Sequence, residues 1–259
     1  MIIKLIILLM LVLLIVFAAS KRGTILVGLA ANALMKGDKA KAERLYRLAD
    51  KIGGMGFDAT LNCGYFFLKN GFLTEARIIF NKAAMSGKLN KIQKQRLKSI
   101  NSLVVWKDGQ LDDAIEMLEE LVEDGYITSV IYETLGLFYI IKKDKEKALE
   151  LCLKGYEYNS DDDVLLDNLA EAYALCGEKD KAMEIYEELL EREPHFPEAY
   201  YGYGILLMEN GKHDEGVEYL GKALEKNFSF LSTLSRERVE DIYYTHKKIS
   251  MENQGRATL

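Results

Sequence analysis

The residues of this chain that could carry out acid–base chemistry or hold a metal are 3 histidines, 3 cysteines and 40 carboxylates. His195, His213 and His246 are isolated in the sequence, and we expect none to share a helix face with another histidine or with a metal ligand. No two cysteines form the C-x-x-C pair typical of thiolate zinc sites, and their odd number argues against a disulfide framework. Motifs for phosphate loops, catalytic serines and H-E-x-x-H metal sites are also missing from the sequence. The sequence therefore predicts no catalytic residue, no metal and no cofactor.

The charged residues are distributed unevenly along the chain. Residues 21–110 contain 17 Lys and Arg but 6 Asp and Glu, although the formal net charge of the whole chain is −6. Lys4 is the one charged side chain before this segment, so residues 111–259 carry a formal charge of −18. Such an asymmetry indicates different surroundings for the two halves. The acidic total, and the lack of aromatic residues among the basic ones, argue against nucleic acid as the partner.

The elements that must position these residues follow from two periodic patterns. One consists of small residues at intervals of 34, 38, 34, 34 and 34, namely Ala42, Ala76, Ala114, Ala148, Ala182 and Gly216. The other has the same intervals and consists of Gly37, Gly71, Gly109, Lys143, Gly177 and Gly211. We interpret each period as two helices joined at the glycine, with the small residue allowing close approach of the second helix. One such pair cannot bury its apolar face alone, so the pairs are expected to stack into a solenoid.

The segment 163–196 has the most typical pattern, with Leu169, Ala170, Tyr173, Ala182, Tyr186 and Pro194. It resembles the tetratricopeptide repeat, whose period is about 34 residues. The least typical copy is 95–128, where Asn101 and Ser102 stand at the usual leucine–glycine pair. The resemblance implies an all-α, right-handed superhelical solenoid of about six helix-turn-helix units over residues 23–230. The units are expected near 23–56, 57–90, 95–128, 129–162, 163–196 and 197–230.

The interval of 38 residues places four extra residues between the second and third units, most simply within 86–94. After the last unit, an amphipathic pattern predicts a capping helix over 231–250. Residues 251–259 are expected to form a tail.

An unbroken apolar run occupies most of residues 2–20 and predicts one N-terminal transmembrane helix. A cleaved signal peptide is the alternative, because Lys4, the short apolar core and Ala18-Ala19-Ser20 imitate its three regions. The anchor is favoured because Lys21 and Arg22 follow at once and the first repeat begins without a spacer. By the positive-inside rule, these basic residues place the repeats in the cytoplasm.

The family register assigns residues of the first helix of each unit to the concave face, where relatives bind peptides. Carried over to this sequence, the partner-binding candidates are Asn62, Tyr65, Leu103, Trp106, Glu133, Asn168, Glu171 and Tyr201, with Leu61, Ser99, Leu137, Asp167 and Ile205 on the same face. Glu133, Asp167 and Glu171 lie where relatives that clamp a terminal carboxylate need basic residues. The groove is therefore expected to accept a basic or amphipathic segment. The alternative is that some of these side chains pack against the next repeat.

The resulting expectation is a membrane-anchored cytoplasmic adaptor or scaffold that binds a protein or peptide and is not an enzyme. Two alternatives stay open. One is a secreted or periplasmic repeat protein after signal cleavage. The other is a non-catalytic accessory subunit of a membrane enzyme complex.

Overall fold

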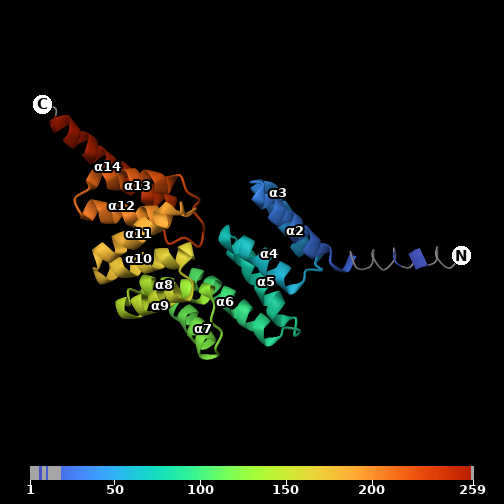
Figure 1. Ribbon diagram of the computed structural model, residues 1–259. Coiled ribbons are helices and arrows are strands. Elements are labelled where there is room, and N and C mark those ends of the chain that lie inside the picture. Colours follow the sequence, from blue (N-terminus) through green and yellow to red (C-terminus); the bar gives the residue numbers. More distant parts are fainter. Residues whose placement is uncertain (1–5, 8–9, 11–18, 258–259) are drawn as a thin grey trace. The chain divides into compact units, whose positions relative to one another are not determined.

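All regular elements are helices in the part of the chain that the computed structural model describes, residues 6, 7, 10 and 19–257 (Figure 1). The all-α prediction is therefore confirmed for this part. The chain forms two compact units, of which the first ends at Lys107 and the second begins at Asp108. The boundary falls within the predicted repeat 95–128, so the two helices of that repeat belong to different units.

The first unit contains two helix pairs and a fifth helix. Its helices are α2 (Arg22–Met35), α3 (Lys39–Ile52), α4 (Phe57–Lys69), α5 (Leu73–Met85) and α6 (Lys91–Lys107). Within it α2 packs on α3, α4 packs on α5, and α4 also contacts α2, α3 and α6. The helix α6 has 17 residues whereas α4 has 13. The four extra residues predicted between the second and third repeats thus lengthen this helix by about one turn.

The second unit stacks three helix pairs between a single first helix, α7, and a single terminal helix, α14. Its helices are α7 (Leu111–Glu123), α8 (Ser129–Lys142), α9 (Lys145–Tyr158), α10 (Asp163–Cys176), α11 (Lys179–Glu191), α12 (Pro197–Glu209), α13 (His213–Leu224) and α14 (Arg236–Ala257). The pairs are α8–α9, α10–α11 and α12–α13, and α14 packs on α13. The sequence placed this last helix at 231–250 with a tail after it, whereas it begins at Arg236 and continues to Ala257.

The small-residue pattern lies in the cores of both units. Ala42, Ala76, Ala114, Ala148 and Ala182 all have no exposed surface. Gly216 occupies the corresponding position on α13, and there even a methyl group would clash. A Cβ at Gly216 would lie 2.4 Å from Cγ of Met208 and 2.6 Å from the carbonyl oxygen of Gly204. Glycine is therefore required because α12 and α13 approach more closely than an alanine would allow.

The glycine pattern marks the turns between paired helices, and its one exception follows the same geometry. Gly177 ends α10 with a φ of 83°, in the left-handed region, and its N–H donates to the carbonyl of Ala174. Lys143 adopts the same conformation at the end of α8, with a φ of 61°. A lysine in this region is strained relative to glycine, so the turn is imposed by the packing of α8 on α9.

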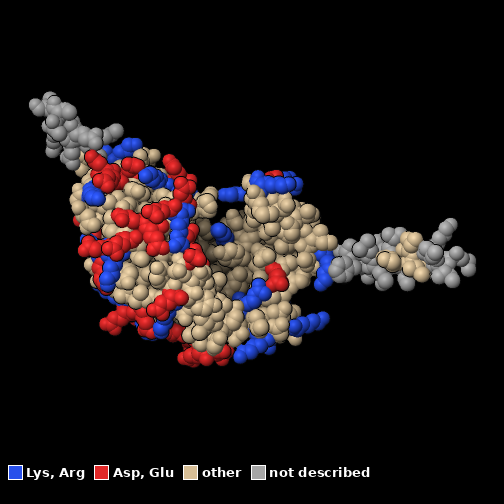
Figure 2. All heavy atoms as spheres, in the orientation of Figure 1, with Lys and Arg blue, Asp and Glu red and all other residues tan. Residues whose placement is uncertain are grey.

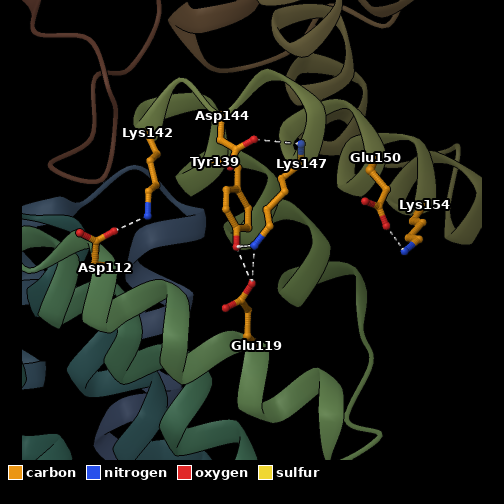
Figure 3. A network of polar contacts seen from close by, with 8 residues as sticks. All are labelled: Asp112, Glu119, Tyr139, Lys142, Asp144, Lys147, Glu150 and Lys154. Carbon is orange, nitrogen blue, oxygen red and sulfur yellow. Dashed lines mark hydrogen bonds and ion pairs between the residues drawn. The ribbon is translucent and has the colours of Figure 1, made fainter.

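A polar network joins α7 to α8 and α9 at the start of the second unit (Figure 3). The hydroxyl of Tyr139 donates to Glu119, and Nζ of Lys147 lies 2.8 Å from that hydroxyl and 3.3 Å from Oε1 of Glu119. These hydrogen bonds raise the pKa of Lys147 to about 12. Lys142 of α8 forms a second ion pair with Asp112 of α7. The network fixes how α7 docks, and its exposed ion pairs contribute little stability on their own.

Within the described part of the chain, none of the helices combines the length and the hydropathy that a membrane span requires.

The segment 2–20, for which an anchor is predicted, lies mostly outside the described residues.

Candidate partner-binding face

In the first unit the predicted binding residues lie on α4 and α6, which contact each other. Asn62 is exposed and Tyr65 is 40% exposed, whereas Leu103 and Trp106 are half-buried. Nζ of Lys107 lies 3.8 Å from the centroid of the Trp106 ring, a cation–π contact. The exposed members of this predicted set, Asn62 and Tyr65, are therefore polar and aromatic rather than acidic.

In the second unit the predicted residues lie on α8, α10 and α12, which are neighbours in that order. Glu133, Glu171 and Tyr201 are half-buried. Asn168 is 3% exposed, and its Nδ2 donates to the backbone oxygen of Glu133 at 2.8 Å. This bond joins α10 to α8, and a role of Asn168 in partner binding stays a prediction.

Three carboxylates gather on α10 and α12, and we call Asp167, Glu171 and Glu198 the acidic cluster. Asp167 is 6% exposed, and its Oδ1 has no hydrogen-bond partner among the described residues. Burial, and then the charges of Glu171 and Glu198, raise the pKa of Asp167 well above its usual range. Burial, and then the charge of Glu198, raise the pKa of Glu171 to about 7. The hydroxyl of Ser232 donates to Oε1 of Glu198.

A further acidic pair consists of Glu133 on α8 and Asp162 at the start of α10. Burial, and then the neighbouring Asp162, raise the pKa of Glu133 to about 7. Asp162 caps α10, because its Oδ1 accepts from the N–H groups of Val164 at 2.9 Å and Leu165 at 3.3 Å. The charged groups that act on Glu133, Asp167 and Glu171 are thus carboxylates, and burial makes their mutual repulsion costly.

The predicted residue set did not include Glu198 or Asp162. Glu198 lies one helical turn before Tyr201, and this i, i+3 spacing was the available signal. The proximity of Asp162 to Glu133 has no signal in the sequence, because it depends on how α10 packs on α8.

The prediction that the histidines are isolated is wrong for two of them. Nε2 of His213 on α13 lies 2.9 Å from Nδ1 of His246 on α14. The two residues are 33 positions apart and meet because α14 folds back on α13. The described residues contain no group of three or more His, Cys, Asp or Glu side chains arranged to hold a metal. The contact between His213 and His246 therefore joins the terminal helix α14 to the helix pair α12–α13.

Comparisons with known proteins match this architecture. The tetratricopeptide-repeat family model matches residues 180–229. The chain is 34% identical over 135 residues to the photosystem I assembly protein Ycf3 of Prochlorococcus marinus, an alignment that covers 46% of this chain and 78% of that protein. This chain belongs to the tetratricopeptide-repeat family.

Two other proteins are similar to this tetratricopeptide-repeat protein, one in its fold and one in the sequence of a part of its length. A tetratricopeptide-repeat protein from Parabacteroides merdae superposes with a TM-score of 0.53 at 20% identity, over 86% of this chain and 87% of that one. The BBSome complex member BBS4 of Bos taurus is 29% identical over 116 residues, which are 45% of this chain. The chain spans only 22% of that bovine protein's length.

In this tetratricopeptide-repeat protein, α8, α10 and α12 are the first helices of three consecutive repeats. The acidic cluster therefore lies on the helices for which the family register predicts the concave face. Residues 108–259 contain 35 Asp and Glu against 16 Lys and Arg, and red side chains gather over the second unit in Figure 2. The local acidity of the cluster thus adds to an acidic field over the whole unit.

Proposed function

We propose that this protein is a non-catalytic adaptor that binds a basic segment of a protein partner on α8, α10 and α12. The observation that carries the proposal is the acidic cluster, because the charged groups among the described residues that shift the pKa values of Asp167 and Glu171 are themselves carboxylates. A partner that brings positive charge would relieve this repulsion, and complementary charge also speeds association and selects partners. Membership of a family that binds protein partners supports the same role. The relative from Prochlorococcus marinus is named as an assembly protein, and an assembly scaffold is the role we propose here.

Site-specific photo-crosslinking in cells tests this proposal. A photoreactive amino acid in place of Tyr201, on the proposed face, is expected to capture a protein partner. Mass spectrometry should show that the captured segment is rich in Lys and Arg. The matched control is the same replacement at Glu150, which is exposed on α9. Capture from position 150 but not from 201, or a captured segment that is acidic, would contradict the proposal.

We also propose that residues 2–20 tether the protein to a membrane and that the repeats face the cytoplasm. The support is the apolar run and the basic residues that follow it, Lys21, Arg22, Lys36, Lys39 and Lys41. A reporter enzyme that works only outside the cytoplasm, fused after Leu259, is therefore expected to be inactive. Deletion of 2–20 should move the protein from the membrane fraction to the soluble fraction. An active reporter would overturn the orientation, and an unchanged distribution after the deletion would overturn the tether.

A further inference from the structure

We propose that the acidic cluster is a subsite for one arginine side chain of the bound segment, with Asp167 and Glu171 as its acceptors. The inference deepens the proposed function and rests on it. It commits to a single residue type in the partner and to two named carboxylates in this chain.

The first support is the unused hydrogen-bonding capacity of Asp167. Asp167 is only 6% exposed, and its Oδ1 accepts no hydrogen bond from the described residues. Buried polar atoms in folded proteins nearly always have a partner, so such an atom calls for a specific explanation. A hydrogen-bond donor supplied by a ligand is an explanation that fits the position of Asp167 on α10, the first helix of its repeat.

The second support is the set of groups around Asp167, which comes from every helix packed there. Glu171 shares its helix, Glu198 comes from α12, Tyr186 from α11 and Cys152 from α9. Burial, and then the charges of Asp167 and Glu171, raise the pKa values of both Tyr186 and Cys152, so these neighbours stay neutral. Glu133 and Asp162 add further acidity on the α8 side. The surroundings thus offer acceptors and negative charge, and a cation is the missing component.

The third support concerns the kind of cation. The two carboxyls Asp167 and Glu171 offer several acceptor oxygens and no donor when ionised, which suits a cation that carries several N–H donors. An arginine side chain reaches a buried acceptor through its long apolar stem while its main chain stays on the surface. Its planar guanidinium carries five donors and is more weakly hydrated than an ammonium group. Arginine can therefore satisfy Asp167 and Glu171 together, which a lysine does less well.

Proton release is an expected consequence of this subsite. An ion pair requires Asp167 and Glu171 to be ionised, whereas burial raises the pKa values of both carboxyls in the free protein. Arginine must therefore displace protons when it binds near neutral pH, and its affinity should increase from pH 6 to pH 8. Calorimetry in buffers of different ionisation enthalpy measures these protons directly.

The test uses the full chain in detergent micelles and N-acetyl-arginine amide as the probe, with binding followed by NMR at pH 8. We expect Asp167→Asn and Glu171→Gln each to weaken binding at least tenfold. The matched control Asp180→Asn, at an exposed position on α11, should change it less than twofold. The lysine amide should bind more weakly than the arginine amide. The citrulline amide, which has nearly the same shape without the charge, should not bind.

Several outcomes would overturn the subsite. One is an unchanged affinity in Asp167→Asn while thermal melting shows that the variant is folded. Another is a wild-type protein that binds arginine and citrulline amides equally. If Asp167→Asn itself failed to fold, Glu171→Gln would decide in the same assay, with an unchanged affinity counting against the subsite.

The same variants separate this inference from the proposed function. If crosslinking from position 201 still captures the same basic segment with equal yield in Asp167→Asn, the adaptor role stands and the subsite is wrong. If arginine amide binds as expected but crosslinking captures nothing, the subsite stands and the partner-binding role is wrong.

Discussion

Ala148→Glu is expected to unfold the second unit under conditions where the wild-type unit is intact. Ala148 has no exposed surface on α9, where this helix packs against α8. A glutamate there must either force the two helices apart or bury an unpaired charge. Such changes cost on the order of 4 kcal/mol or more, which is a large part of the stability of a typical domain.

Hydrogen exchange measured on peptides from α8 to α10, together with thermal melting by circular dichroism, checks this prediction. The amides of these helices should lose most of their protection in Ala148→Glu. The control is Lys145→Glu, an exposed position on the same helix, which should change stability by only about 0.5 kcal/mol. If Ala148→Glu kept wild-type protection, the close packing of α8 on α9 would be incorrect.

The stability of the second unit is expected to decrease as the pH rises from about 5 to about 8. The pKa values of Glu133 and Glu171 are raised from 4.5 to about 7 in the folded protein. Between these values the folded state holds a proton that the unfolded state has released. Stability from these groups is therefore complete below pH 4.5 and is lost as the pH passes 7. Each shift corresponds to roughly 3 kcal/mol at most, because both side chains keep some solvent contact.

Urea unfolding of the full chain at pH 5 and pH 8 measures this loss. Glu171→Gln should remove about half of the loss of stability that Glu133 and Glu171 cause together, because a glutamine has no proton to release. Glu150→Gln is the control, since this exposed carboxyl on α9 is paired with Lys154 and its pKa is lowered. A wild-type stability that rises between the two pH values, or a Glu171→Gln variant with the wild-type slope, would contradict the assignment.

The sequence predicted the helix pairs well because their signals are local and periodic. A fully buried small residue such as Ala182 and a left-handed turn such as Gly177 recur at a fixed spacing, so they can be found without coordinates. Lys143 shows that the spacing is more informative than the residue type, because it takes the glycine conformation.

The features that the sequence did not predict depend on how successive helices pack. Glu198 approaches Asp167 across two helices, and His213 meets His246 through the folding back of α14. Neither contact repeats with the period of the chain. The division after Lys107 is likewise not visible in the period, since α6 continues the pattern with one additional turn.

The buried carboxyl of Asp167 also has a consequence for the evolution of the chain. A single-base change in an aspartate codon gives asparagine, which would keep the shape of the side chain and remove a carboxyl whose ionised form burial disfavours. Random substitution should therefore eliminate this aspartate quickly in any lineage that no longer needs it, because the replacement favours the folded state. Lineages that keep an acidic residue at this position, despite so short a mutational path to a more stable protein, should be those under continuing selection for what the carboxyl binds.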